Sequence, residues 1–146
     1  MRVSTRVEYG LIALTDIVLY GENGSAVSAP DIAQREKISH KYLEQILMLL
    51  RQAGFITAQK GIRGGYALAR SADKISMKEV LNALDNSILS EMDDDRGNGE
   101  LRSAINNCFW EKINKSLNQY TAEMKLSDFA GQCRNNVTGG WDNYVI

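Results

Sequence analysis

The sequence predicts a mainly α-helical protein that carries one small β-hairpin. Apolar residues recur at helical spacing in several segments that start with serine or threonine, the residue types that cap helix N-termini. The spacing changes once, in "FITAQKGIRGGYALAR", where two short β-type runs flank a glycine-rich centre. Beyond residue 100, apolar residues recur over a stretch long enough for one extended helix.

The composition is that of one globular domain, or of one small domain with an extension. The chain has 146 residues, of which 44% are hydrophobic and 24% are charged, and it contains one proline. It has no apolar run of about 18 residues and no apolar N-terminal signal segment. We therefore expect a cytoplasmic protein without contact with a membrane. Cys108 and Cys133 form neither a disulfide framework nor a CxxC metal pair.

Two helices are predicted in the first forty residues. "STRVEYGLIALTDIVLY" contains Thr5 and Glu8 at the spacing of a capping box, followed by apolar residues at helical spacing. After "ENGS", the segment "SAPDIAQREK" begins with Ser28 as N-cap and has Pro30 in its first turn. The second helix is therefore expected to be short.

A third helix and the hairpin follow. Ser39 is the expected N-cap of "SHKYLEQILMLLRQAG", and Gly54 is its expected C-terminal stop. Leucine and isoleucine at helical spacing give this helix one buried side. The hairpin tip combines Lys60 and Arg63 with three glycines, so we expect an exposed, basic turn.

The second half of the chain contains one more short helix, "SMKEVLNALD" with a capping box at Ser76 and Glu79, and then an acidic loop. A long helix follows it, and "LSDFAGQC" predicts a further short helix capped by Ser127. The predicted divisions are a winged helix-turn-helix domain at 1–84, an acidic loop at 85–99, dimerisation helices at 100–134 and a flexible C-terminal tail at 135–146.

Two short helices followed by a basic hairpin are typical of a winged helix-turn-helix, which binds DNA. The second helix of the pair fits the major groove, and the wing reaches the backbone or the minor groove. Residues 1–84 contain 11 Lys and Arg against 8 Asp and Glu, whereas residues 85–146 contain 6 against 10. The front half therefore has a charge of +3 and the rest −4, so the front half is expected to hold a polyanion.

The residues expected at the DNA are Ser39, His40, Lys41, Tyr42, Glu44, Gln45, Arg51, Lys60, Arg63 and Gly64. Gln45 suits adenine edges, and Lys41 and Arg51 suit phosphate or guanine. Gly64 allows the wing backbone to approach closely. The alternative for the helix is an ordinary solvated face, and for the wing a solubilising hairpin tip. His40 fits either a DNA contact or a solvated position.

The segments "MRVSTRVEYGLIAL", "SHKYLEQILMLLRQAGFI" and "KGIRGGYALAR" resemble the Rrf2 family of bacterial winged-helix regulators. The resemblance covers roughly residues 1–130. It implies a transcriptional regulator rather than an enzyme, acting as a homodimer on a double-stranded DNA operator. It also implies that Glu44 tunes base choice. The expected dimer interface on the long helix consists of Leu101, Ile105, Cys108, Ile113, Leu117 and Tyr120; a core within one chain is the alternative.

The cluster-binding members of that family have three cysteines in the acidic loop and the start of the next helix, but residues 86–107 of this chain have none. An iron–sulfur cluster normally takes four ligands, mostly thiolates. We therefore expect neither a cofactor nor a metal site. A cluster of unusual mixed ligation, with Cys108 and Asp93, Asp94, Asp95 or Glu8, stays open, as does a redox-sensing role for Cys108. The first expectation for Cys108 is a small apolar residue in the dimer interface.

The sequence ends in "WDNYVI" after "NNVTGG", which we interpret as a flexible linker. This end resembles the tails of serine acetyltransferases, which dock in O-acetylserine sulfhydrylase, and those of cysteine-metabolism repressors within the Rrf2 family. The resemblance implies a repressor of cysteine and sulfur genes that binds this enzyme through Tyr144, Val145 and Ile146. The alternatives are a tail packed on its own dimer, and an iron–sulfur or thiol redox sensor on the same scaffold.

Overall fold

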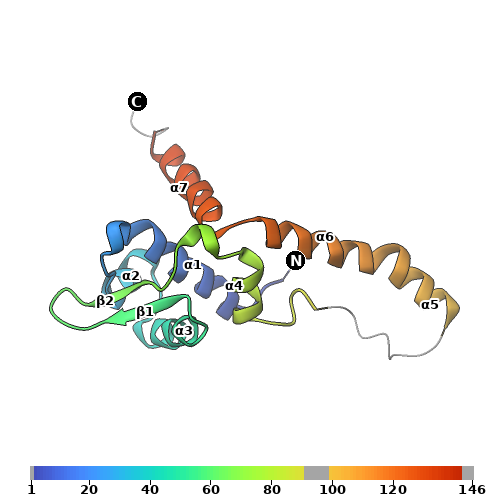
Figure 1. Cartoon of the computed structure of the whole chain (residues 1–146), viewed down its shortest axis with the longest axis horizontal. Coiled ribbons are helices and arrows are strands. Elements are labelled where there is room, and N and C mark those ends of the chain that lie inside the picture. The colour runs from blue at the N-terminus through green and yellow to red at the C-terminus, as the bar shows by residue number, and fades with distance from the viewer. Residues whose placement is uncertain (1, 91–98, 143–146) are drawn as a thin grey trace.

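The computed structural model describes residues 2–90 and 99–142, and it has a packed body from which two helical segments extend (Figure 1). The body contains α1 Thr5–Tyr20, α2 Ala29–Glu36, α3 His40–Gln52, β1 Ile56–Gln59, β2 Gly65–Leu68 and α4 Met77–Leu84, with 3₁₀ turns at Glu22–Gly24 and Ala72–Lys74. The second half contains α5 Glu100–Ile105, a π-helical turn Asn106–Trp110, α6 Glu111–Glu123 and α7 Leu126–Asp142. The predicted mainly α-helical fold with one hairpin is confirmed.

The serine caps set the starts of the body helices. The side chains of Ser28 and Ser39 accept hydrogen bonds from amides of the first turns of α2 and α3, as predicted. At α4 both halves of the predicted capping box are present, since Ser76 N donates to Glu79 Oε2 at 2.8 Å and Glu79 N to Ser76 Oγ at 3.1 Å. The prediction for α1 is wrong by one residue: Ser4 is its N-cap, and the Ser4 hydroxyl accepts from Val7 N at 3.3 Å.

Helix α1 runs through the centre of the body and contacts α2, α3, α4, β2 and α7. Leu14 of α1 and Leu47 of α3 are completely buried. Gly10 permits the close approach of α4, because a Cβ there would lie 2.4 Å from Leu84 Cδ2. Contact of α1 with five other elements explains why this helix, rather than the hairpin, organises the body.

A buried ion pair also connects α1 with α2. Asp16 is 2% exposed, and its Oδ1 and Oδ2 accept from Arg35 Nη2 at 2.9 Å and Nε at 3.0 Å. The Arg35 guanidinium also lies 4.0 Å from the centre of the Tyr20 ring. This fork geometry satisfies both oxygens of the buried carboxylate and so fixes α2 on α1.

Helices α5 and α6 and the π-helical turn form one continuous helical segment, here called the arm, which extends away from the body on the side opposite the hairpin (Figure 1). The prediction of one long helix is confirmed, but no pattern in the sequence indicated the π turn. The arm meets the body at its C-terminal end, where Met77 N donates to Met124 O at 2.9 Å and Leu126 N to Ile75 O at 2.8 Å. These two bonds connect the start of α4 to the join between α6 and α7.

The last helix differs from its prediction at both ends. It begins at Leu126, so Ser127 lies inside the first turn, and Lys125 N instead donates to Asp128 Oδ2 at 3.4 Å. It continues to Asp142, through the segment interpreted as a flexible linker after residue 134. Arg134 Nη2 donates to Leu19 O at 3.4 Å, so tertiary contact with α1 reaches the predicted boundary. The helix continues beyond it in spite of the weak helix propensity of Asn and Gly there.

The first residues of the predicted acidic loop fold back on the arm. Asn118 Nδ2 donates to Leu89 O at 3.2 Å, and Asn114 Nδ2 donates to Ser90 O at 2.8 Å. Asp85 accepts from the Ser87 hydroxyl at 2.6 Å, which together with the Ser87 amide lowers the pKa of Asp85. Residues 91–98, with Asp93, Asp94 and Asp95, lie outside the described residues.

Within residues 2–90 and 99–142, no helix is long and apolar enough to cross a membrane.

Candidate nucleic-acid interface

Helices α2 and α3 form a helix-turn-helix, and residues 37–39 make the turn between them. Lys37 ends α2 in the left-handed conformation, with φ at 55°. Ser39 Oγ then accepts from Tyr42 N at 3.3 Å and caps α3. Because both ends of the turn are fixed by local chemistry, the start of α3 is fixed, and so is the side of α3 that faces outward.

Helix α3 has two distinct sides. Leu43, Ile46, Leu47 and Leu50 are at most 2% exposed and pack into the body. The opposite side, called the recognition face below, carries His40, Lys41, Glu44, Gln45, Met48, Arg51 and Gln52, all of them exposed. An exposed helix face of this kind fits the width of the DNA major groove.

The first two turns of the recognition face contain a polar pair. His40 Nε2 lies 3.1 Å from Glu44 Oε1, and the two side chains are 55% and 62% exposed. Exposed pairs of this type contribute little to stability. Breaking the pair, so that either side chain can contact a base or a phosphate, therefore costs little free energy of folding.

Tyr42 and Ser39 lie at the edge of this face and serve to position it. Tyr42 is half-buried, and its ring packs edge-on against Tyr9 of α1 with 5.4 Å between ring centres. Ser39 uses its hydroxyl as the cap. The structure thus gives both residues a structural task in addition to the DNA contact expected from the sequence.

The wing is an antiparallel hairpin in which Ile56 faces Leu68 and Gln59 faces Gly65. Its tip turn is closed by a hydrogen bond from Gly64 N to Gly61 O at 2.9 Å. The side chains of Lys60, Ile62 and Arg63 are exposed around this turn. The tip is therefore exposed and basic, as predicted from the sequence, with one apolar side chain between the two cations.

Two wing glycines are required by the hairpin itself. A Cβ at Gly64 would lie 2.4 Å from Gln59 O, across the tip turn. Gly65 has φ at 152°, and a Cβ there would lie 2.4 Å from Val27 O. The close approach at Gly65 allows Val27 and Tyr66 to exchange two backbone hydrogen bonds of 2.8 Å, which tie the wing to the segment before α2. Gly64 thus has a role in the fold, beside the DNA approach predicted for it.

The wing and α3 lie on the same side of the body, and the arm extends in the other direction (Figure 1). Lys41 and Arg51 on α3 and Lys60 and Arg63 on the wing are all exposed. A helix that enters the groove and a hairpin beside it, each with cations, match the way in which winged helices hold the two strands of a duplex.

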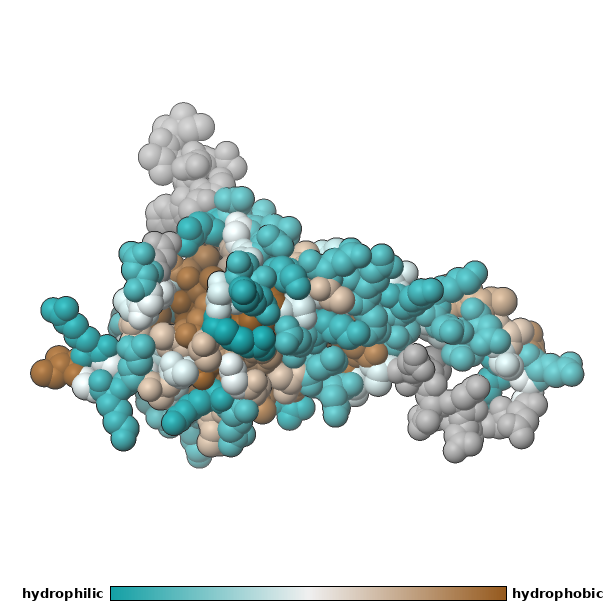
Figure 2. Space-filling model, viewed as in Figure 1, coloured by the Kyte–Doolittle hydropathy of each residue, from teal (hydrophilic) through white to brown (hydrophobic). Residues whose placement is uncertain are grey.

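Sequence reasoning missed two exposed apolar residues at this surface. Met48 is 57% exposed in the middle of the recognition face, and Ile62 is fully exposed at the wing tip, where Figure 2 shows a brown end to the wing. Met48 was hidden in the apolar run "ILMLL", although its helical spacing from Lys41, Glu44 and Arg51 could have identified it. An apolar side chain at the major groove can contact a thymine methyl group.

The arm displays the residues predicted for the dimer interface. Leu101, Ile105, Ile113 and Tyr120 are 74%, 45%, 40% and 62% exposed, Cys108 is exposed and Leu117 is half-buried. Phe109 and Trp110, absent from the prediction, are 53% and 43% exposed and their rings meet edge-on at 4.9 Å. In Figure 2 apolar patches appear among the hydrophilic residues of the arm.

The described residues do not fit an iron site. They contain no group of three or more His, Cys, Asp or Glu side chains that could hold a metal ion. Cys108 lies in the π-helical turn of the arm and Cys133 on α7, both as free cysteines. The set of four ligands that a cluster requires is therefore not assembled by residues 2–90 and 99–142.

Comparison with known proteins gives one family and several close folds. The model of the Rrf2 family, described as an iron-dependent transcriptional regulator, matches residues 3–132. The transcriptional regulator IscR of Cereibacter sphaeroides is 32% identical over 134 residues, which cover 88% of this chain and 86% of that protein. The protein rrf2 of Nitratidesulfovibrio vulgaris is 46% identical over 85 residues, 58% of this chain and 56% of that protein.

Two solved structures have the same fold. CymR, the global cysteine regulator of B. subtilis, superposes with a TM-score of 0.76 at 25% identity, covering 90% of this chain and 98% of CymR. IscR of T. potens superposes with a TM-score of 0.73 at 28% identity, covering 91% of this chain and 88% of that one. The likeness therefore includes the arm as well as the winged helix.

Proposed function

The chain belongs to the Rrf2 family of DNA-binding transcriptional regulators, and from this premise we propose that it acts as a homodimeric repressor of cysteine and sulfur metabolism genes. Its work is regulation of transcription and not catalysis. The observation that carries the proposal is that α3, with its exposed recognition face, and the basic wing lie on the same side of the body. In the proposed complex, α3 lies in the major groove and the wing follows the adjacent backbone.

Each predicted residue has a distinct proposed role in this complex. Gln45 reads an adenine edge, and Glu44 restricts the bases accepted beside it. Lys41 and Arg51 bind phosphate or guanine, and His40 contacts DNA once it leaves Glu44. Lys60, Arg63 and the backbone of Gly64 bind the phosphates or enter the minor groove.

The arm supports the dimer. Residues 101, 105, 109, 113 and 117 are four positions apart. In a regular α-helix, four residues rotate about the helix axis by about 40° more than one full turn, so the direction of the side chain would change by about 160° from residue 101 to residue 117. The π turn Asn106–Trp110 contains one extra residue in its turn, which reduces this rotation about the helix axis by about 100°. The row is thereby kept to one side of the arm, as an interface with a second molecule requires.

A duplex-binding experiment tests the DNA proposal. Purified protein is titrated onto genomic duplex fragments selected by repeated rounds of binding, at two salt concentrations. We expect an enriched pseudo-palindromic site, bound by two protomers, whose affinity falls steeply with salt. Selection that enriches no sequence, or binding that does not change in a Lys41, Gln45 and Arg63 triple alanine variant, contradicts the proposal.

Two observations support the cysteine branch. The fold is similar to that of CymR over 90% of this chain, and the chain contains only two cysteines, none of them in the acidic loop. We propose that O-acetylserine sulfhydrylase is the partner and that Tyr144, Val145 and Ile146 dock in its active site, which must bind an amino-acid carboxylate. These three residues lie outside the described part of the chain.

Calorimetry separates this partner from its alternatives. We expect the full chain to bind the sulfhydrylase, and replacement of Tyr144 and Ile146 by alanine to abolish binding while DNA affinity stays unchanged. O-acetylserine should compete with the chain for the same site. Equal binding by the double variant would reject the docking segment, and no binding by the full chain would reject the partner and leave the DNA proposal intact.

The second candidate function is iron–sulfur or thiol redox sensing, which is favoured by the family description as iron-dependent. Anaerobic purification followed by iron and sulfide analysis decides between the two. We expect no stoichiometric iron, and we expect Cys108→Ser to leave DNA affinity within a few fold. Stoichiometric iron and sulfide, or DNA binding that Cys108→Ser makes insensitive to oxidant, would favour the sensor.

A further inference from the structure

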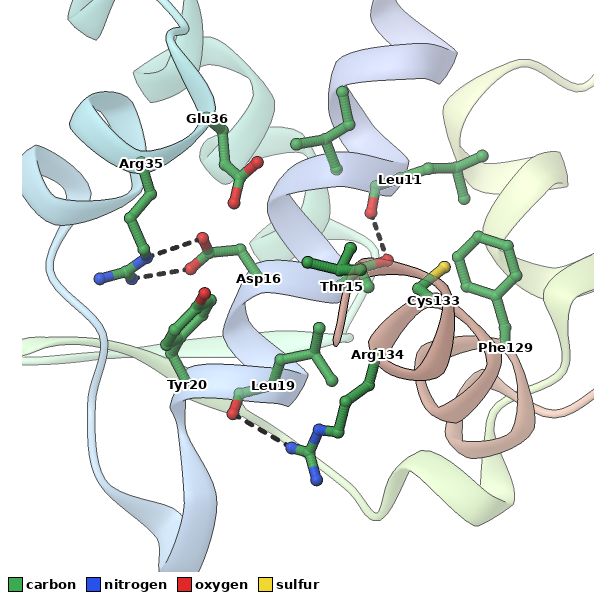
Figure 3. Close-up of a pocket in the computed structure, with 12 residues that line it drawn as sticks. Leu11, Thr15, Asp16, Leu19, Tyr20, Arg35, Glu36, Phe129, Cys133 and Arg134 are labelled. Atoms are coloured by element: carbon green, nitrogen blue, oxygen red, sulfur yellow. Dashed lines mark hydrogen bonds and ion pairs between the residues drawn. The ribbon is translucent and has the colours of Figure 1, made fainter. Parts of the chain in front are cut away.

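A cavity of about 630 Å³ lies between α1, α2 and α7, on none of the surfaces discussed above (Figure 3). Helix α1 contributes one side of it, α2 contributes Arg35 and Glu36, and α7 contributes Phe129, Cys133 and Arg134. This volume is within the range of small-molecule sites in proteins. The cavity also joins the helix that precedes α3 to the last helix of the chain.

The walls of the cavity are mostly apolar, and one end is polar. Leu11, Ile12 and Leu19 of α1 line the cavity together with Phe129 and Val137 of α7. At the polar end, Asp16 and Glu36 present two carboxyl groups that face one another, as Figure 3 shows. An apolar chamber with a few convergent polar groups is the usual form of a ligand site.

At the polar end, Asp16 is paired with Arg35, whereas Glu36 lies beside the negative charge of Asp16. Nε and Nη2 of Arg35 both donate to Asp16, whose carboxylate is buried. Glu36 comes directly after Arg35 in α2, and its carboxyl group is directed at Asp16. Burial, with Asp16 as a second cause, raises the pKa of Glu36 to about 7. A donor that carries positive charge would therefore be favourable beside Glu36, where a second negative charge is not.

We propose that this cavity binds a small molecule with an ammonium group and an apolar body. The ammonium group donates to Glu36 at the polar end, and the apolar body packs between Leu11, Ile12, Leu19 and Phe129. The ligand holds α7 to α2 and acts on residues 37–39, the turn that sets the start of α3. Binding of the ligand can thus be coupled to the orientation of the recognition face.

The test uses 2-phenylethylamine as the probe and phenylacetate as its matched control of opposite charge. Binding of each to the full-length protein is followed by amide NMR shifts in the absence of DNA, so the outcome is independent of the proposed DNA function. We expect the amine to bind with millimolar affinity, as is usual for a fragment of this size, and to shift resonances of α1, α2 and α7. Phenylacetate should bind at least about tenfold more weakly.

Two variants identify the site, and a third serves as their control. Glu36→Gln removes the acceptor charge and should weaken amine binding about tenfold. Val137→Lys adds a cation at an exposed position of the cavity wall and should weaken it as well. Glu123→Gln removes an equal charge from an exposed site on α6 that does not line the cavity, and should leave binding unchanged.

Three results would overturn the inference. The first is the absence of amine-induced shifts at concentrations up to about 10 mM, well above the affinity expected for such a fragment. The second is equal binding of the amine and phenylacetate, or equal effects of Glu36→Gln and Glu123→Gln. The third is that the cavity resonances respond to protein concentration and not to the probe, because a second copy of the chain would then be covering the cavity.

Discussion

The body and the arm use apolar side chains in opposite ways. In the body, Leu14 and Leu47 are completely buried. In the arm, Leu101 is 74% exposed and Ile105 is 45% exposed, although these side chains are as apolar as those of the two body leucines. A row of exposed apolar residues is costly in water unless something covers it. The comparison shows that the body is stabilised by contacts within one chain, and it supports the proposal that a second molecule covers the arm.

The most direct way to break this comparison is to shorten one leucine in each region. Leu47→Ala leaves a cavity in a packed core and should lower the free energy of unfolding by about 2–5 kcal/mol at every protein concentration. Leu101→Ala removes an exposed side chain, so it should act only through association. Urea unfolding over a range of protein concentrations measures both. A concentration-independent loss for Leu101→Ala would show that the arm is buried within its own chain.

A charge placed in the arm tests the second molecule itself. Ile105→Asp should weaken self-association by about 2 kcal/mol or more, roughly thirtyfold, because a carboxylate in an apolar interface is desolvated without a partner. Lys112→Asp, which changes a polar position of the same arm, is the control. Sedimentation analysis gives the dissociation constants. If Ile105→Asp associates as strongly as the wild type, the row of exposed apolar residues is not the interface.

The DNA contacts are assigned to the body, and two substitutions separate their types. Gln45→Ala should cost about 1–3 kcal/mol on the preferred site and relax the base choice at one position. Arg63→Ala should weaken binding to every sequence and reduce the slope of log affinity against log salt concentration by about 1. Binding curves on specific and scrambled duplexes at several salt concentrations compare the two. The assignment is wrong if Gln45→Ala loses affinity equally on both duplexes.

The sequence was most informative where local chemistry determines the structure. Ser28, Ser39 and the capping box at Ser76 were found because each cap depends on residues within one turn. The wing was found because its glycines and its period change are also local. The extent of α7 was missed because it depends on packing of Arg134 against α1, 115 positions away, which no local pattern contains.

The site was less predictable than the fold for the same reason. The polar residues of the recognition face follow from helical spacing, but Met48 was not singled out, because it lies in the apolar run "ILMLL", which contains more apolar residues than one side of the helix can bury. The π turn that brings Phe109 into the exposed row has no sequence marker. The cavity beside Asp16 combines residues from three helices, so it exists only once they are packed.

The smallest expected effect concerns the polar contact between α1 and α2, and it appears as a dependence of stability on pH. Burial, with the hydrogen bond and like charge of Asp16, raises the pKa of Glu36 from 4.5 to about 7. Between these two values the folded protein binds more protons than the unfolded chain, so the contribution of Glu36 to stability is complete below about pH 4.5 and is lost as pH rises through 7. The effect is modest because Glu36 is only half-buried and solvent screens its charge.

Glu36→Gln isolates this effect, because a glutamine side chain can donate to Asp16 and does not ionise. The melting temperature of the variant should exceed that of the wild type at pH 8, and the difference should shrink as the pH is lowered to 5. Thermal unfolding at closely spaced pH values measures it, with Glu123→Gln as a control for the general effect of net charge. A difference in melting temperature that stays constant from pH 5 to pH 8 would mean that burial and Asp16 do not raise the pKa of Glu36. The polar contact between α1 and α2 would then consist of the ion pair between Arg35 and Asp16, and the polar end of the cavity would lose its preference for a cation.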